Sequence, residues 1–473
     1  MEIKNLSIEE ITKLTKKGEV SVKEIAKQTL EYIKEKENTI RSFINIDEEK
    51  VLKDAEKLDG SEKKGKLFGV PVAIKDNMNL EGTETTAGSK ILKGYISPYT
   101  ATAVRKLIQE GALIIGKTNM DEFAMGSSTE NSAFFKTHNP VNPEHVPGGS
   151  SGGSAAAVRA GEVTASLGSD TGGSIREPAA FCGVIGMKPT YGRVSRYGLI
   201  AFASSLDQIG PFARNVKDAA VMLEVIAGFD PNDETSVQRT DTHFTSLLGK
   251  EIKGKKIGLI KEVMDFDLQE EVKNSFEKTA SALQKLGAEI TEVSIPHLKY
   301  ALPAYYIIAP SEASANLSRF DGVRYGLLVE GKNLRETYEK TRTEGFGTEV
   351  KRRILIGTFA LSAGYYDAYY LKASRVRRLI EKDFEKAFEK VDTLLTPTTA
   401  KTAFKIGEIT NPLEMYMNDI FTIPVNLAGL PAISVPSGTD KKGLPIGMQL
   451  IGKWFEESEL LQIAYAMEKE IGG

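Results

Sequence analysis

One short segment limits the possible folds of this chain more than any other. Residues 68–77 read FGVPVAIKDN, and positions 70–74 within them are all apolar. A short apolar run without polar alternation is typical of a strand that is buried on both faces of a sheet. Such a strand needs helices on both sides. Lys75 ends the run, so a charged side chain is expected at the end of an interior strand.

The rest of the chain alternates in the same way. A helix and then a strand are predicted within residues 102–119, and two further strands at 255–260 and 288–295 are separated by a helical segment. Residues 126–154 are rich in Gly, Ser, Asn and Pro, which predicts a loop that ends at a small-residue helix. Strands that alternate with helices predict an α/β fold with a sheet covered on both faces.

Two helices are predicted before the first strand. Ser7 to Glu10 and Ser21 to Glu24 each have the serine and glutamate spacing of a capping box, and Gly18 between them is a stop signal. No internal repeat, low-complexity tract or linker interrupts the chain. One domain over residues 1–473 is therefore expected, with a catalytic core at about 60–215 and an inserted helical and α/β part at about 250–400 that contributes substrate contacts.

The composition narrows the possible functions. The 473 residues are 41% apolar and 26% charged with a net charge of −3, which favours neither a nucleic-acid groove nor an anionic membrane. Cys182 is the only cysteine, so a disulfide within the chain and a cysteine-based zinc site are excluded. The first residues lack the apolar region of a signal peptide, and no run is long enough to span a bilayer. A cytoplasmic location is expected.

Two loops dense in glycine and serine are the strongest candidates for a functional site. They are Pro147–Ser154 (PGGSSGGS) and Gly168–Arg176 (GSDTGGSIR). Such density indicates tight turns or a close approach of backbone to a ligand, and both loops lie among apolar segments, which argues against flexible linkers. Partial matches to kinase, P-loop, aspartic-protease and nucleophile-elbow motifs all lack a required second element.

The histidines offer no good general base for a serine nucleophile. The chain has four: His138, His145, His243 and His297. Only the first two lie close to a glycine-serine loop, and their surroundings predict solvated loop. Lys75 is the remaining candidate, because burial at the end of an apolar strand can lower a lysine pKa by several units.

Lys75, the GGSSGGS loop and the GSDTGGSIR loop, in this order and spacing, resemble the amidase signature family. The resemblance implies that Ser174 is the nucleophile, Lys75 the base and Ser150, on a cis peptide bond, the relay between them. It also implies an oxyanion hole made by the backbone N–H groups of Thr171, Gly172, Gly173 and Ser174. The implied fold is a large mixed central sheet covered by helices on both faces.

Other segments, among them GKTNMDEFAMGSSTE and YMNDIFTIPVNLAGLPAISVP, are similar to one branch of that family, the glutaminase (A) subunits of tRNA-dependent amidotransferases. For this branch the resemblance implies that Arg353 binds the carboxylate of L-glutamine and Asp419 its ammonium, with Tyr305 and Ser127 lining the same pocket. A surface charge for Arg353 and a turn or cap for Asp419 are the structural alternatives.

The same resemblance implies partners. The chain would hydrolyse glutamine and supply ammonia to an amidating (B) subunit, with a small (C) subunit stabilising the pair in a heterotrimer. The amidating subunit would use ATP and Mg²⁺ to modify misacylated tRNA, either Glu-tRNA(Gln) or Asp-tRNA(Asn), so that the assembly acts as a carbon–nitrogen ligase. No metal or cofactor is expected in this chain itself. A stand-alone amidase and a non-catalytic scaffold are the alternatives.

The sequence departs from the family pattern in two places. Glu177 stands where the family usually has glutamine, and residues 85–89 read TTAGS in place of the commoner TTCAS. Glu177 lies three residues after Ser174. A negative charge there could keep Lys75 protonated, so the Glu177 side chain is expected to point away from the site.

Overall fold

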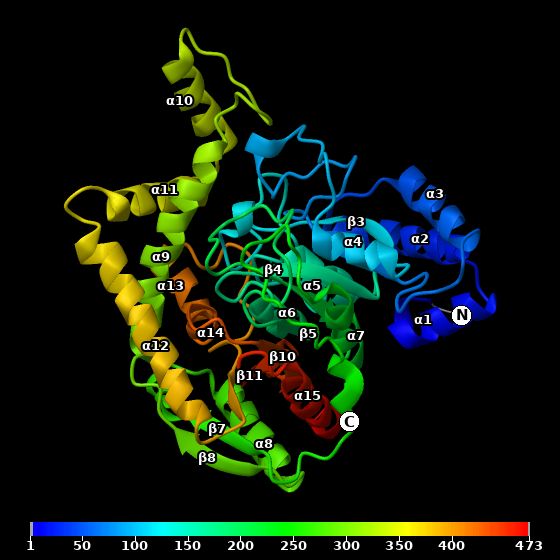
Figure 1. The fold of residues 1–473 in the computed structure, drawn as a ribbon, viewed down its shortest axis with the longest axis vertical. Coiled ribbons are helices and arrows are strands. Elements are labelled where there is room, and N and C mark those ends of the chain that lie inside the picture. The colour runs from blue at the N-terminus through cyan, green and yellow to red at the C-terminus, as the bar shows by residue number, and fades with distance from the viewer. Residues whose placement is uncertain (1–2, 472–473) are drawn as a thin grey trace.

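The computed structural model describes residues 3–471 (Figure 1). Within that range 11 strands form one sheet in the order β1-β3-β2-β4-β6-β5-β10-β11-β9-β7-β8. The strands are β1 (Phe43–Asn45), β2 (Pro71–Lys75), β3 (Leu113–Thr118), β4 (Ala165–Asp170), β5 (Ile185–Lys188), β6 (Gln208–Ala213), β7 (Lys256–Ile260), β8 (Glu289–Val293), β9 (Thr393–Pro397), β10 (Ala432–Thr439) and β11 (Pro445–Gly452). β2 pairs in parallel with β3 and β4, and β7 with β8 and β9, whereas the other pairs are antiparallel. The sheet is mixed, as predicted.

Fifteen α-helices surround this sheet within the described range. They are α1 (Ile8–Lys17), α2 (Val22–Ile40), α3 (Glu48–Asp59), α4 (Thr102–Gln109), α5 (Gly152–Ala160), α6 (Arg176–Cys182), α7 (Val216–Ile226), α8 (Glu270–Lys285), α9 (Ala301–Asn316), α10 (Leu334–Gly345), α11 (Thr348–Leu361), α12 (Lys372–Phe388), α13 (Pro412–Tyr416), α14 (Ile423–Leu427) and α15 (Glu457–Ile471). None of the helices within residues 3–471 has the length and apolar character needed to span a membrane.

Strand β2 lies in the interior of the sheet, as its apolar run predicts. Val72 and Ile74 belong to one apolar cluster with side chains of α1, α4, α7 and α15. Ala73 belongs to another cluster with side chains of α2, α3 and α5. Successive side chains of a strand point to opposite faces, so both faces of β2 are covered. This confirms the predicted helical layers on either side of the sheet.

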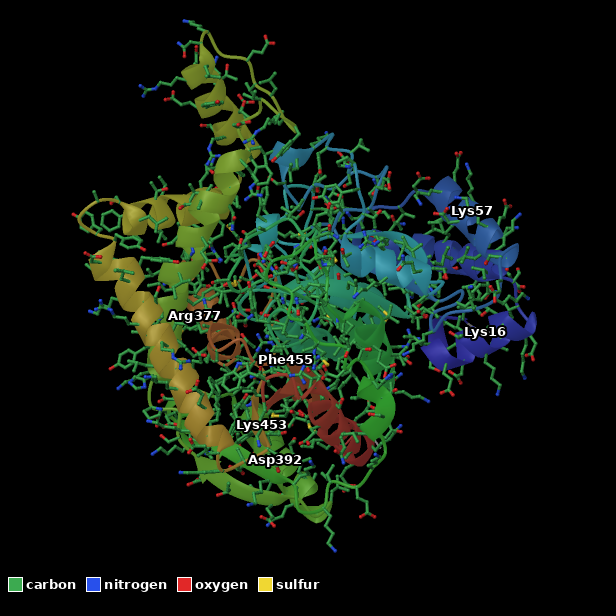
Figure 2. All side chains as sticks on the ribbon, viewed as in Figure 1. Lys16, Lys57, Arg377, Asp392, Lys453 and Phe455 are labelled. Atoms are coloured by element: carbon green, nitrogen blue, oxygen red, sulfur yellow. The ribbon has the colours of Figure 1, made fainter. Side chains whose placement is uncertain are left out.

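Helices α1 and α2 begin at the predicted serines, and α1 ends at the predicted glycine. Ser7 forms the complete capping box, and Gly18 ends α1 with a φ of 73°. Ser21 accepts a hydrogen bond from the Glu24 N–H at 3.1 Å, which is half of the second expected box. Lys16 of α1 and Lys57 of α3, both labelled in Figure 2, are exposed.

Residues 256–397 extend the sheet and also form a wall beside it. β7, β8 and β9 lie at one end of the strand order, and α9, α11 and α12 stand along the left side of the view with α10 projecting above them (Figure 1). Arg377 of α12, labelled in Figure 2, donates to the Leu427 carbonyl at 2.8 Å and to Ser205 Oγ at 2.8 Å. These bonds attach α12 to the end of α14 and to the loop that carries Ser205.

Candidate active site

The site begins with a buried lysine that is surrounded by serines. Lys75, the last residue of β2, is 0% exposed. Its Nζ donates to Ser150 Oγ at 2.7 Å, to Ser151 Oγ at 2.8 Å and to Ser169 Oγ at 2.9 Å. Adjacent parallel strands end at the same edge of a sheet, which is why the end of β2 meets Ser169 near the end of β4. The two glycine-serine loops therefore converge on this one amine.

The electrostatics of Lys75 suit a base. Burial lowers the pKa of its ammonium to about 7, although the charges of Asp121, Asp170 and Asp207 act in the opposite direction. In the folded protein a large share of Lys75 is thus neutral near pH 7 and able to accept a proton. None of the three carboxylates accepts a hydrogen bond from Nζ; among the described residues its acceptors are serine oxygens.

The two serines proposed by sequence analysis lie on two loops that are hydrogen-bonded to each other. Ser150 follows a cis peptide bond from Gly149, as expected, and both Ser150 and Ser174 are buried. The next N–H along the first loop, that of Ser151, donates to the Ser174 carbonyl at 3.2 Å. The lysine, the Ser150–Ser151 pair and the Ser174 loop therefore form one contiguous cluster.

The loop that carries Ser174 is anchored by a buried ion pair. Arg176 Nη2 lies 3.0 Å from Asp170 Oδ1, and both side chains are 0% exposed. Burial opposes ionisation of Asp170, but the adjacent guanidinium holds its pKa down to about 2. Asp170 also accepts the N–H groups of Gly173 at 2.9 Å and Ile175 at 3.1 Å. A charge-assisted set of this kind fixes the loop on both sides of Ser174.

The backbone donors of the loop differ in availability. The Gly173 N–H is already donated to Asp170, so of the four expected donors it is the one in use. No acceptor within residues 3–471 receives a hydrogen bond from the N–H of Thr171, Gly172 or Ser174. These three groups are the ones that a substrate oxyanion could engage.

Tyr305 and Asp419 lie directly against this loop. A Cβ on Gly172 would come within 2.8 Å of the Tyr305 ring, and a Cβ on Gly173 would come within 2.6 Å of Asp419 Oδ1. Only glycine fits at either position. Ser127 Oγ donates to Asp419 Oδ2 at 2.6 Å, and burial raises the pKa of Asp419 to about 7. The structure thus brings together Tyr305, Asp419 and Ser127, three of the four expected substrate-binding residues.

Arg353 lies in an aromatic enclosure and not on the helix surface. Its side chain, from α11, is 3% exposed, and its guanidinium lies 5.3 Å from the Tyr306 ring centre and 5.4 Å from that of Tyr416. Nε donates to Glu349 Oε1 at 2.8 Å. Among the described residues no group accepts a hydrogen bond from Nη1 or Nη2, which leaves that edge of the guanidinium available to a carboxylate.

The expectation for Glu177 is wrong. Its side chain points into the protein, is 0% exposed, and accepts the Gly149 N–H at 2.8 Å. Glu177 is the second residue of α6, a helix that is buried along its whole length between the sheet and the first glycine-serine loop. A side chain on that turn has no route to solvent, which the sequence alone did not reveal.

The expectation for one histidine is also wrong. His145 is 4% exposed, because the segment around it pairs with Lys405 in a short antiparallel bridge. His138 is partly exposed and bonds the Pro143 carbonyl through Nδ1 at 2.7 Å. Neither histidine forms a hydrogen bond with a site serine in the described part of the chain, so the inference that Lys75 is the candidate base is unaffected.

Sequence reasoning missed the supporting acids. Asp121 is fully buried and accepts the N–H groups of Thr129 at 2.8 Å and Asn131 at 3.0 Å, which closes the loop that carries Ser127. Asp207 accepts the Thr171 hydroxyl at 2.6 Å. For Asp170 a signal did exist, because it and Arg176 are opposite charges six residues apart in the GSDTGGSIR loop, one on each side of Ser174.

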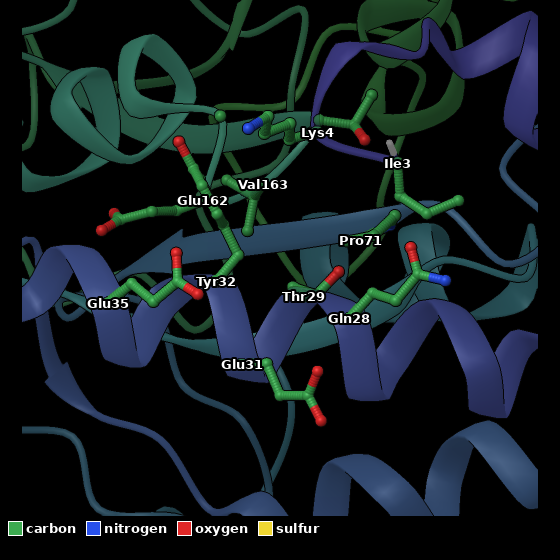
Figure 3. Close-up of a pocket in the computed structure, with 12 residues that line it drawn as sticks. Ile3, Lys4, Gln28, Thr29, Glu31, Tyr32, Glu35, Pro71, Glu162 and Val163 are labelled. Atoms are coloured by element: carbon green, nitrogen blue, oxygen red, sulfur yellow. The ribbon is translucent and has the colours of Figure 1, made fainter. Parts of the chain in front are cut away.

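A pocket of about 310 Å³ lies elsewhere, between α2 and the segment that joins α5 to β4 (Figure 3). Gln28, Tyr32 and Glu162 are among its lining residues, and no residue of the site described above is. The Glu162 carboxyl is buried and accepts the Ser42 hydroxyl. Burial raises the pKa of Glu162 well above its usual range.

Comparison with known proteins places this geometry in context. Residues 24–461 match the family model described as Amidase. The A subunit of the glutamyl-tRNA(Gln) amidotransferase of Carboxydothermus hydrogenoformans is 58% identical over 475 residues, which cover 99% of this chain and 98% of the relative. The crystal structure of the corresponding A subunit from Thermotoga maritima has a TM-score of 0.84 at 48% identity and covers 99% of this chain and 95% of that one. A peptide amidase from Stenotrophomonas maltophilia has a TM-score of 0.84 at 30% identity, covering 99% and 97%.

Proposed function

The chain belongs to the amidase family and is an amide-cleaving enzyme, and from this premise we propose that it is the glutaminase subunit of a tRNA-dependent amidotransferase. The observation that carries the proposal is the similarity, over 99% of the chain, to relatives named as the A subunit of glutamyl-tRNA(Gln) amidotransferase. The charges and hydrogen bonds of the site support the chemistry that this assignment requires.

In the first half-reaction Ser174 Oγ attacks the carbon of the glutamine side-chain amide. Its proton passes through Ser150 to neutral Lys75, and the carbonyl oxygen becomes an oxyanion. The free N–H groups of Thr171, Gly172 and Ser174 are the candidate donors to that oxyanion. Gly173, whose N–H is taken by Asp170, has a different role in this proposal: its φ of 147° lets the loop turn toward Ser174.

Collapse of the oxyanion breaks the carbon–nitrogen bond. The departing nitrogen takes the proton back from Lys75 through Ser150 and leaves as ammonia, while Ser174 retains the glutamyl group as an ester. Water then attacks the ester with the same base and relay, which releases glutamate and restores the serine. The hydrogen bond from Lys75 to Ser150 supports the second part of this proton path, and the transfer between Ser174 and Ser150 is part of the proposal.

Glutamine recognition follows from the two charged residues. The free edge of the Arg353 guanidinium suits the α-carboxylate, and Asp419 suits the α-ammonium. Tyr305 covers the loop between Asp419 and the oxyanion donors, and Ser127 orients the Asp419 carboxyl through their 2.6 Å hydrogen bond. A substrate with both charges is thereby distinguished from a simple amide.

The proposal includes partners. Ammonia from this chain would reach the amidating (B) subunit, which uses ATP and Mg²⁺ to convert Glu-tRNA(Gln) or Asp-tRNA(Asn) to the amide form, with the small (C) subunit completing a cytoplasmic heterotrimer. On this view the chain itself needs no cofactor or metal, and misacylated tRNA is met through the complex.

The test is ammonia release from L-glutamine by the chain co-expressed with candidates for these two partner subunits. We expect release that is abolished by Ser174→Ala and falls at least a hundredfold in Lys75→Ala. No release from an assembled complex, with a known glutaminase as positive control, would exclude the glutaminase assignment.

A stand-alone amidase is the second candidate, favoured by the structural similarity to a peptide amidase at 30% identity. Arg353→Ala separates the two. A glutaminase loses glutamine hydrolysis in this variant, whereas an amidase that acts on uncharged amides keeps its activity.

A further inference from the structure

Glu177 contacts the backbone that presents Ser150. Its Oε2 accepts the Gly149 N–H at 2.8 Å, and Gly149 is bonded directly to Ser150. On the other side of Gly149 lies Asp121, whose carboxylate would collide with a Cβ at that position. The backbone before Ser150 is thus enclosed between two carboxyl groups, and among residues 3–471 Glu177 is the acceptor of the Gly149 N–H.

The surroundings of Glu177 disfavour a negative charge. Among the described residues no lysine, arginine or histidine forms an ion pair with it, and Arg176, which precedes it, is committed to Asp170. The charges that act on it most strongly are those of three carboxylates, Asp419, Asp121 and Asp170, and the Cys182 thiol lies on the same helix. Burial and then the Asp419 charge raise the pKa of Glu177 well above its usual range.

The second carboxyl oxygen of Glu177 also disfavours an ionised side chain. Oε1 of Glu177 is buried and has no hydrogen-bond partner within residues 3–471. An ionised carboxylate would leave this oxygen as a buried charge without compensation, which is costly. A neutral acid lowers that cost, because an unpartnered hydroxyl on Oε1 is less costly to bury than an unpartnered charge, while Oε2 remains the acceptor for the Gly149 N–H.

We propose that Glu177 is a positioning residue that works as a neutral acid, holding the Gly149 N–H so that Ser150 stays between Lys75 and Ser174. The inference deepens the proposed function, because it concerns the same serine relay. A negative charge at position 177 would favour a protonated Lys75 and would oppose the oxyanion. A neutral Glu177 adds no such charge. Its side chain is then a shape equivalent of glutamine, whose amide oxygen can accept the same N–H.

The reactivity test uses a fluorophosphonate probe on the assembled complex. Ser174 Oγ attacks phosphorus, the P–F bond breaks, fluoride leaves, and the hydroxyl proton passes through Ser150 to Lys75. Labelling of the Ser174 peptide, followed by mass spectrometry, needs no glutamine, so a failed glutaminase assignment cannot be mistaken for a failed relay. We expect Glu177→Gln to keep at least one third of the wild-type labelling rate and Glu177→Leu to lose at least tenfold.

Infrared spectroscopy tests the charge directly. The difference spectrum of wild type minus Glu177→Gln at pH 7 should show the C=O stretch of a protonated carboxyl and no carboxylate bands. Glu162→Gln is a matched control, since Glu162 is another buried acid with a raised pKa but lies outside the site. It should show the same infrared loss with no change in Ser174 labelling.

Three results would overturn the proposal: carboxylate bands for Glu177 at pH 7, a Glu177→Gln labelling rate as low as that of Glu177→Leu, or full labelling in a folded Glu177→Leu. If Glu177→Leu does not fold, the infrared spectrum and the glutamine variant still decide.

Discussion

Acidification should inactivate the serine nucleophile through a single group, Lys75. Its pKa of about 7, lowered by burial from the usual 10.5, means that about half of the lysine is neutral at pH 7. The neutral fraction rises to about nine tenths at pH 8 and falls to about one tenth at pH 6. A rate that needs neutral Lys75 should therefore fall about tenfold between pH 8 and pH 6.

Burial is the main reason why a large fraction of Lys75 is neutral at pH 7. An exposed lysine of pKa 10.5 would be neutral in about three molecules per ten thousand at pH 7. The lowered pKa thus increases the available base about a thousandfold, which is within the range that a positioned general base contributes. Lys75→Arg removes this base, because a guanidinium does not release its proton in proteins, and should slow the reaction about a hundredfold or more.

The assay is the rate of Ser174 labelling by the neutral fluorophosphonate probe from pH 5.5 to 9, which avoids the titration of Asp419 as a glutamine ligand. Lys188→Met is the matched control: Lys188 is as buried as Lys75 and burial lowers its pKa to about 7 too, but its Nζ donates to the Pro189 carbonyl and not to a serine. Its loss should leave the midpoint in place. A rate that is flat from pH 6 to 8, or a Lys75→Arg variant with wild-type labelling, would refute the reasoning.

Three further predictions concern binding and stability. Arg353→Ala should lower kcat/KM for glutamine roughly 10- to 150-fold, because charge-assisted hydrogen bonds to the carboxylate, which contribute about 1.5–3 kcal/mol, are lost. Arg352 is the half-exposed neighbour of Arg353, and Arg352→Ala should change kcat/KM little. Glutamine binding, measured by calorimetry, should weaken below pH 7, because Asp419 takes up a proton there. The raised pKa of Asp419 in the folded protein also makes the free energy of unfolding fall as the pH rises from 3.8 to about 7, so Asp419→Asn should melt at a higher temperature than wild type at pH 8. An equal or lower melting temperature would contradict this. Lys75→Met should be inactive but should also melt at a higher temperature than wild type at pH 7. This gain in melting temperature should shrink as the pH rises from 7 to 10.5, because in that window the lysine of the unfolded chain still holds the proton that the folded lysine has lost. A gain that does not change with pH would contradict the reasoning.

The sequence was sufficient for the frame of the site. The apolar run before Lys75 predicted an interior strand, and the glycines around Ser150 and Ser174 predicted tight turns or loops whose backbone closely approaches a ligand. Both signals are local, since a strand buried on both faces and a glycine-rich turn impose their composition on a few consecutive residues.

What the sequence could not provide was the direction of individual side chains. Glu177 was expected to point away, yet it lies on a short helix that is buried on every side. His145 was expected in a solvated loop, and its burial depends on pairing with a segment 260 residues later, around Lys405. Asp121 accepts hydrogen bonds from the loop that follows it, and it packs against Gly149, which lies 28 residues later. Such facts depend on tertiary packing, which residue types alone do not encode.

The central claim is that this chain cleaves glutamine through an ester on Ser174. The most direct measurement is an acid quench of the assembled complex during turnover of L-glutamine, followed by mass spectrometry of the Ser174 peptide. We predict a glutamyl group on Ser174 that is absent in Lys75→Arg and in Ser174→Ala, with ammonia release lost in the same variants. Ammonia release that persists in Ser174→Ala, or a glutamyl group on any other residue, would contradict the account.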